Sequence, residues 1–244
     1  MSTSTLPPPA SVTVSTSGLE LPSVSFFGRT LAEYAQFFAL DPVALRGRAV
    51  LDVAGPASFT AEACKLGVDA VDPLYGCPVE TLATHVQLDY AKMFAEMRVE
   101  PHLWRFRSFP SINAAALNLR SAARRFLNDY EAHFAHGRYV GARLPRRPFL
   151  DRAFDLVLCA HLLFIYARRF DLAWHVIACR ELVRVSAGEV RIHAVCGADG
   201  RRYPELAALR AELAEAGIAS EVVPVNCEFF VGSSSMQVLK TASS

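Results

Sequence analysis

Continuous apolar runs and helical stripes of apolar residues alternate along the chain. A short apolar run is typical of a buried strand, whereas apolar residues that recur every three or four positions are typical of a helix. By these patterns we expect strands at 48–54, 68–73, 154–160, 189–195, 220–226 and 235–241, and helices at 26–40, 60–67, 170–185 and 203–217. Strands that alternate with helices form a parallel sheet with right-handed crossovers. The last two strands follow one another closely, which predicts an antiparallel pair at the sheet edge.

A long stretch between the two halves, residues 78–140, has a helical pattern. In an open α/β sheet, ligands bind outside the carboxyl ends of the strands. We therefore expect this insertion to form a helical lid over a pocket at that edge. Residues 1–24 are rich in Ser, Thr and Pro, which predicts a disordered leader, and residues 25–244 are expected to form a single domain.

The composition favours chemistry on a small molecule. The 244 residues are 52% hydrophobic and 20% charged, with a formal net charge of +1. Nucleic-acid binding demands a basic surface, and no apolar run reaches membrane-spanning length, so we expect neither partner. Six scattered cysteines without a CxxC pair predict reduced thiols in a cytoplasmic protein. The histidines lack metal-ligand spacing, so no metal is expected. The oligomeric state is left open.

The stretch AVLDVAGPASFTAEACKLGVDAVDPLYG, residues 49–76, carries the first chemical signal. Asp52 ends one strand, Gly55 lies in the following turn, and Asp72 ends the next strand, where it is placed to accept hydrogen bonds from a ribose diol. The turn lacks the G-x-G-x-x-G pattern of a pyrophosphate loop, which disfavours a dinucleotide. The alternative is structural: a buried Asp commonly caps a turn, and Gly55 is an ordinary turn residue. The joint spacing after a strand favours the nucleotide-site interpretation.

This stretch, together with FDLVLCAHLLFIY, ELVRV and GEVRIHAV, resembles the class I S-adenosylmethionine (SAM) dependent methyltransferases. The resemblance covers about residues 26–241. It implies a Rossmann-like α/β fold, with a seven-stranded, mostly parallel sheet and one antiparallel edge strand. It also implies SAM as cofactor or substrate, a small-molecule partner and a role in secondary metabolism.

Carried over by motif, the resemblance implies which residues surround SAM. Those around its amino-acid part, ribose, adenine and sulfonium would be, in chain order, Asp52, Ala54, Gly55, Asp72, Pro73, Arg143, Leu144 and Cys159. This sequence differs from the family's pattern in the loop after the first strand, which keeps only one of the usual glycines. From the residues themselves, Arg29 beside Tyr34 is a candidate clamp for the SAM carboxylate, with a surface arginine as the alternative. His161 is the candidate general base, with a packing histidine as the alternative.

A narrower resemblance points to the branch that makes azetidine-2-carboxylate. The segments RRFLNDYE with Asn128 and LLFIYARR with Tyr166 are similar to its polar pair. In that branch the α-amine of SAM attacks its own γ-carbon, giving azetidine-2-carboxylic acid and releasing methylthioadenosine. The alternative is that Asn128 is solvated and Tyr166 packs in the core.

Three hypotheses about function follow. The first, and the one we favour from the sequence, is cyclisation of SAM by a lyase that uses Asn128, Tyr166 and His161. The second is methyl transfer to a small-molecule acceptor, which yields S-adenosylhomocysteine. The third is a SAM-binding module without catalysis, suggested by the glycine-poor loop.

Overall fold

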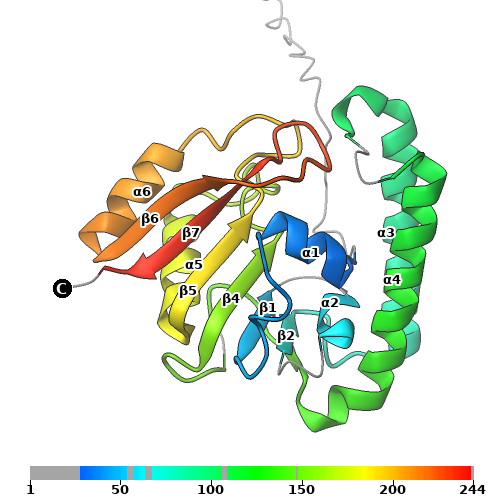
Figure 1. The fold of residues 1–244 in the computed structure, drawn as a ribbon, viewed down its shortest axis with the longest axis horizontal. Coiled ribbons are helices and arrows are strands. Elements are labelled where there is room, and N and C mark those ends of the chain that lie inside the picture. The colour runs from blue at the N-terminus through cyan, green and yellow to red at the C-terminus, as the bar shows by residue number, and fades with distance from the viewer. Residues whose placement is uncertain (1–27, 54–57, 64–67, 106–108, 147, 243–244) are drawn as a thin grey trace, which may run out of the picture.

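The structure is a computed structural model that describes residues 28–53, 58–63, 68–105, 109–146 and 148–242. Its centre is a seven-stranded sheet in the order β3-β2-β1-β4-β5-β7-β6 (Figure 1). The strands are β1 Val50–Val53, β2 Val68–Asp72, β3 Tyr139–Gly141, β4 Phe154–Ala160, β5 Ser186–His193, β6 Ile218–Pro224 and β7 Ser235–Thr241. The α/β alternation read from the sequence is therefore confirmed.

The pairing of the strands agrees with the expected mixed sheet, with two corrections. β1 to β5 pair in parallel, and β7 runs antiparallel to both β5 and β6. The antiparallel strand is thus one place in from the edge, and β6 is the edge strand. β3 lies at the end of the stretch that was expected to be helical. The sequence pattern did not predict this strand because three residues are too few to show a strand period.

Helices cover both faces of the sheet (Figure 1). On one face, α5 (Leu172–Val185) and α6 (Leu206–Glu215) bury their apolar stripes against alternate residues of the central strands, such as Leu51 and Val157. On the other face lie α1 (Leu31–Phe37) and α2 (Ser58–Glu62), which pack over the intervening positions. Thr30 caps α1 with a capping box, and this sets its first residue later than the expected 26.

The insertion between β2 and β3 consists of α3 (Val79–Val99) and α4 (Ile112–His133), with short 3-10 turns at Pro101–Leu103 and Phe134–His136. The buried residues of α3 recur every three or four positions: Leu82, Val86, Tyr90, Phe94 and Met97. They join the core that also contains α1 and α2. The insertion is therefore a wall of the domain beside α2 (Figure 1), and its closure as a lid stays a prediction.

The leader proposed for residues 1–24 lies outside the described residues. Within the described ranges, no helix is long and apolar enough to cross a bilayer. Five cysteines belong to these ranges, Cys77, Cys159, Cys179, Cys196 and Cys227, and all are unpaired thiols. The expectation that the thiols are reduced in the cell stays a prediction.

Candidate functional site

The carboxyl ends of four parallel strands meet at one edge of the sheet. β1 ends at Val53 between β2, which ends at Asp72, and β4, which ends at Ala160; β5 ends beside β4 at His193. The sheet order reverses between β1 and β4, since the chain moves outward on one side of β1 and returns on the other. Open α/β sheets bind ligands at such a reversal. The candidate site is therefore the carboxyl edge around β1, β4 and β5.

Asp52 lies at this edge and accepts two side-chain hydrogen bonds. Its side chain projects toward the α1 face and is 1% exposed. The Tyr34 hydroxyl donates to its Oδ1 at 2.8 Å, and the Thr60 hydroxyl donates to its Oδ2 at 3.2 Å. The Tyr34 ring stacks on Phe59 with 4.4 Å between centroids. Asp52 thus fastens α1 and α2 to β1, and the structure brings Asp52 and Tyr34 together.

Burial raises the pKa of Asp52 to about 7, because an ionised carboxylate is poorly solvated there. The hydrogen bonds from Tyr34 and Thr60 oppose this rise, and the nearby charge of Asp72 adds to it. Burial and Asp52 together raise the pKa of Tyr34 well above its ordinary value, so its hydroxyl remains a donor. Contact of Asp52 with the amino-acid part of SAM stays a prediction.

Arg29 precedes α1 and reaches over the same edge. Its Nη1 lies 3.2 Å from Glu33 Oε1, and Asn118 donates to the other carboxylate oxygen of Glu33 at 3.3 Å. The guanidinium carbon lies 4.0 Å from the ring centroid of Phe229 and 5.6 Å from that of Phe37. Arg29 is 6% exposed, so the alternative of a surface arginine is wrong. Its role as a carboxylate clamp stays a prediction.

His161 directly follows β4 and has a left-handed backbone, with φ of 49°. Its backbone N–H donates to the carbonyl of His193. Its ring packs edge-on against Phe37 and His193 and at a tilt against Phe230. Both ring nitrogens are buried, and neither has a hydrogen-bond partner among the described residues. Burial, with the charges of Arg29 and His193, holds the pKa of His161 well below its usual range. The imidazole is therefore neutral, with an unpartnered acceptor nitrogen.

His193 ends β5 and forms the second half of an imidazole pair with His161. Its ring stacks on Phe37 with 4.7 Å between centroids and an interplanar angle of 8°. Its Nε2 lies 2.7 Å from the carbonyl oxygen of Ser233, which assigns the ring proton to Nε2. Its Nδ1 is then an acceptor, buried and without a partner in the described part of the chain. Burial lowers the pKa of His193 to about 4.

Asp72 lies at the carboxyl end of β2, as expected, and is 6% exposed. Its Oδ1 accepts a hydrogen bond from the backbone N–H of Leu74 at 2.8 Å, which closes the turn after β2. Pro73 is exposed in this turn. Contact between Asp72 and a ribose stays a prediction. Ala54 and Gly55, expected in the loop after β1, lie outside the described residues.

The residues expected near adenine and the sulfonium are dispersed. Arg143 is exposed and Leu144 is buried, both in the loop after β3. Cys159 is fully buried in β4 on the α5 side of the sheet, in a core cluster with Val53 and Ile192. That face is opposite the one on which Asp52 meets Tyr34. Cys159 is therefore a core residue in this structure. The sequence pattern correctly placed it near the end of β4, but its side chain lies on the face opposite Asp52.

The structure does not place Asn128 and Tyr166 in a common polar pair. Asn128 is exposed on α4, whose buried stripe runs through other positions: Ala115, Leu119, Ala122, Ala123, Phe126 and Tyr130. Tyr166 is 5% exposed in the loop after β4, where it lines a cavity of about 660 Å³ to which Asn128 does not contribute. The alternative prediction, that Asn128 is exposed to solvent, is therefore confirmed.

His193 was not among the predicted site residues, although the sequence contained a signal for it. His193 lies in a predicted strand next to the β4 strand in the α/β order, so its end had to lie beside His161. Within the described residues, no group of three His, Cys, Asp or Glu side chains is placed to hold a metal ion. The arrangement offers neutral imidazole acceptors, a buried carboxyl and a buried guanidinium, which suit proton transfer and recognition of a charged ligand.

No protein-family model matches the chain, and no curated protein matches it. Solved structures with a similar fold do exist. The magnesium protoporphyrin IX methyltransferase from Synechocystis PCC 6803 with bound SAM is 12% identical, over 85% of this chain and 74% of that one, with a TM-score of 0.44. A SAM dependent methyltransferase from Aquifex aeolicus is 16% identical, over 85% and 91%, with a TM-score of 0.41.

An O-methyltransferase family protein from Burkholderia thailandensis is 14% identical, over 87% of this chain and 56% of that one, with a TM-score of 0.46. All three TM-scores are below 0.5, and at these identities the likeness does not show what this chain binds. The observed sheet has seven strands of which one is antiparallel, as the methyltransferase resemblance of the sequence implies, but that strand lies one place in from the edge.

Proposed function

We propose that the chain binds SAM at the carboxyl edge of its sheet and transfers the methyl group to a small-molecule acceptor, with His161 as the general base. The observation that carries this proposal is the buried, neutral imidazole at the end of β4, with two ring nitrogens that lack a partner among the described residues. A buried polar group without a partner is costly. An acceptor hydroxyl would satisfy it.

The proposed division of roles follows from the strand ends. Asp72, at the end of β2, would hold the ribose diol by its carboxylate. Arg29, buried before α1, would hold the carboxylate of SAM. His161, two strands from Asp72, would then face the sulfonium.

Bound SAM would supply the methyl group and leave as S-adenosylhomocysteine, with the electrons of the broken carbon–sulfur bond on sulfur. A ring nitrogen of His161 would accept the proton that the attacking acceptor oxygen loses. Because burial holds the pKa of His161 low, the resting ring is unprotonated at neutral pH, and a proton that it accepts would pass on readily to solvent. The apolar rings of Phe37 and Phe230 around it limit the access of water.

Cyclisation of SAM to azetidine-2-carboxylic acid, favoured from the sequence, requires acceptors that aim the α-amine at the γ-carbon. The pair of Asn128 and Tyr166 was expected to aim it, but Asn128 is exposed on α4 and does not line the cavity that Tyr166 lines. Methyl transfer therefore replaces cyclisation as the first candidate. The module without catalysis remains the third hypothesis, and product analysis separates all of them.

The test is to incubate the purified chain with SAM alone, and with SAM plus a small-metabolite extract, and to identify products by mass spectrometry. Methyl transfer predicts S-adenosylhomocysteine with the extract only. Methylthioadenosine from SAM alone would favour cyclisation, and the absence of both products would favour the module.

A variant pair assigns the base. His161→Asn keeps a residue type that tolerates the left-handed backbone, and we expect its transfer rate to fall by about 100-fold or more with little change in affinity for S-adenosylhomocysteine. His136→Asn, at an exposed histidine, is the control and should be fully active.

A further inference from the structure

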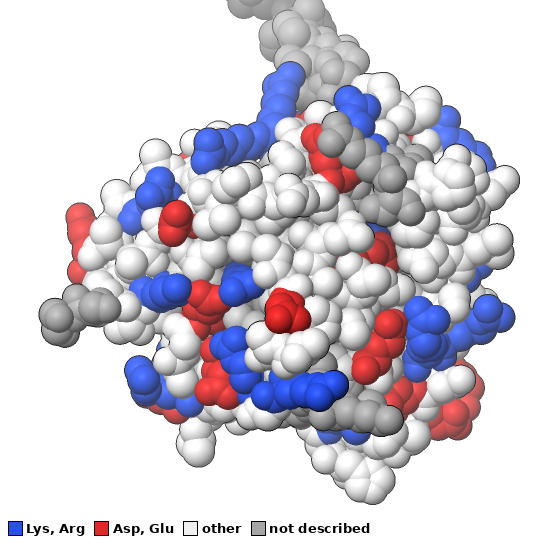
Figure 2. Space-filling view, viewed as in Figure 1, with Lys and Arg blue, Asp and Glu red and all other residues white. Residues whose placement is uncertain are grey.

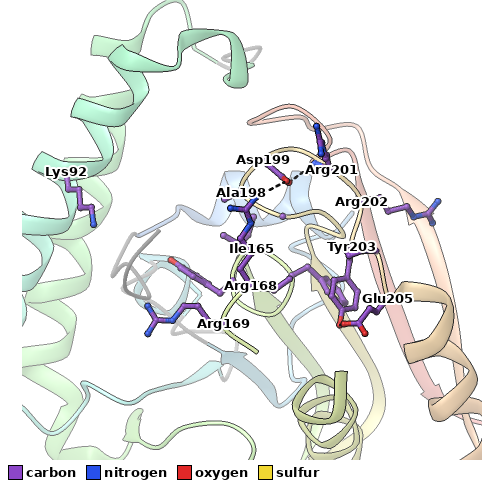
Figure 3. Close-up of a pocket in the computed structure, with 15 residues that line it drawn as sticks. Lys92, Ile165, Arg168, Arg169, Ala198, Asp199, Arg201, Arg202, Tyr203 and Glu205 are labelled. Atoms are coloured by element: carbon purple, nitrogen blue, oxygen red, sulfur yellow. Dashed lines mark hydrogen bonds and ion pairs between the residues drawn. The ribbon is translucent and has the colours of Figure 1, made fainter. Parts of the chain in front are cut away.

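The cavity that Tyr166 lines lies between the loops that follow β4 and β5, with Lys92 of α3 on its far side (Figure 3). Its volume of about 660 Å³ is in the range of small-molecule sites. The loop after β4 starts at His161, and the cavity lining begins three residues later at Phe164. The cavity therefore shares a loop with the proposed base.

The cavity lining is strongly cationic. Five of its side chains are basic, namely Lys92, Arg168, Arg169, Arg201 and Arg202, and two are acidic, Asp199 and Glu205. The formal excess is three positive charges (five minus two), in a chain whose net charge is +1. On the face in Figure 2, basic and acidic side chains are interspersed. The cavity lining thus has a net positive charge, which attracts anions.

The two carboxylates of the lining are held by their own loops. Asp199 Oδ1 accepts a hydrogen bond from the backbone N–H of Arg201 at 3.0 Å, and Asp199 Oδ2 lies 3.9 Å from Arg168 Nη2. Glu205 accepts a hydrogen bond from the Tyr203 hydroxyl at 3.3 Å. The contact between Arg168 and Asp199 is at the outer limit of an ion pair, so most of the guanidinium's hydrogen-bonding capacity remains for a ligand.

The floor of the cavity is aromatic. Phe164, Tyr166 and Tyr203 are each at most 5% exposed, and the rings of Phe164 and Tyr203 pack with 5.0 Å between centroids. Ile165 completes this surface. An apolar floor below a rim of cations suits a ligand with a flat apolar body and an anionic group at one end.

We propose that this cavity binds a small aromatic carboxylate, with the ring on the floor of Phe164, Tyr166 and Tyr203 and the carboxylate toward Lys92 and Arg168. The cavity's preference for an aromatic anion follows from its own lining. That this ligand is the methyl acceptor rests on the function proposed above.

The test uses two probes of similar shape, the anion 4-hydroxycinnamate and its neutral amide, 4-hydroxycinnamamide. Binding to the full chain is measured by calorimetry without SAM. We expect the carboxylate to bind roughly tenfold more tightly than the amide at low ionic strength, since it adds one charge-assisted contact. This ratio should fall toward one at high salt. Equal affinities at low salt, or no binding of either probe, would overturn the proposal.

The variants Lys92→Gln and Arg168→Gln test whether these two side chains bind the carboxylate group of the probe. Combined, they should reduce the preference for the carboxylate to about twofold or less while leaving the binding of the amide unchanged. Arg46→Gln, at an exposed arginine before β1, is the matched control and should keep the full preference. Retention of the preference in the combined variant would place the anion elsewhere. Because SAM is absent, an inactive chain that still prefers the carboxylate would refute the proposed function and leave the anion site standing.

Discussion

Replacement of Tyr34 by Phe removes one of the two side-chain donors to the buried carboxylate of Asp52. The Tyr34 hydroxyl donates at 2.8 Å, and Thr60 donates to the other oxygen. A hydrogen bond to a charged group contributes about 1.5 to 3 kcal/mol, and one between neutral groups about 1 kcal/mol. Tyr34→Phe should therefore lower the free energy of unfolding by about 2 kcal/mol when Asp52 is ionised, and by about 1 kcal/mol when it is protonated.

The sign of the pH dependence follows from the pKa of Asp52. Burial raises it to about 7 in the folded chain, whereas an unfolded Asp titrates near about 3.9. Between these values the folded state binds the extra proton, so stability from this group is complete below about pH 4 and is lost as pH rises through about 7. At about 1.4 kcal/mol per pH unit, the loss amounts to about 4 kcal/mol.

The pH profile of the unmodified chain does not isolate Asp52. Burial lowers the pKa values of His161 and His193, so their contribution to the free energy of unfolding is lost as pH falls. The contribution of Asp52 is lost as pH rises, and the two trends offset one another in an overlapping pH range. The difference between Tyr34→Phe and the unmodified chain removes the contribution of the two histidines. We expect this difference, from urea unfolding, to be about 1 kcal/mol larger at pH 8.5 than at pH 5.

Tyr90→Phe is the matched control. The Tyr90 hydroxyl is also buried, but it donates to the carbonyl of Leu119 and accepts from the N–H of Gly28. These two backbone groups do not titrate, so the loss of the two hydrogen bonds should cost the same at both pH values. An equal cost of Tyr34→Phe at pH 5 and pH 8.5 would refute the reasoning about Asp52.

Three other substitutions test the fold and the site assignment by urea unfolding. Gly141→Ala would bring a Cβ to 2.3 Å from the backbone oxygen of Tyr75, so we expect a loss of about 3 kcal/mol; an unchanged stability would show that β3 does not lie where it is described. Asp129→Asn weakens the contacts of 2.8 and 2.9 Å with Arg138 that join α4 to the start of β3. It should lower the free energy of unfolding by about 1 to 2 kcal/mol, and this loss should be smaller at high salt. Asn128→Ala, at an exposed helical position, should change stability by under about 0.5 kcal/mol and leave any turnover of SAM intact, whereas abolished turnover would return Asn128 to the mechanism.

The sequence predicted the core of the fold well, because buried strands and amphipathic helices impose distinct periods. β4 and β7 have the bounds that their apolar patterns gave, 154–160 and 235–241. β3 was missed because it is short and takes its place from pairing with β2. Such pairing depends on contacts distant in sequence, which no local pattern records.

The site was predictable where a residue's role follows from strand order, and not where it depends on side-chain direction. Asp72 and His161 lie at strand ends, as expected. Asn128 lies two residues from both Phe126 and Tyr130, and these buried positions on α4 leave it on the opposite side of the helix. Cys159 is adjacent to the reacting edge in sequence, yet alternation along β4 turns its side chain to the other face.

The most direct test of the central claim is calorimetric titration of S-adenosylhomocysteine into the chain and into Asp72→Asn. Asn keeps an oxygen that can accept the N–H of Leu74, so the turn after β2 is preserved. We expect saturable binding at one site, weakened roughly tenfold in the variant by loss of a charge-assisted hydrogen bond. No measurable binding to the folded chain, or equal binding to both proteins, would contradict it.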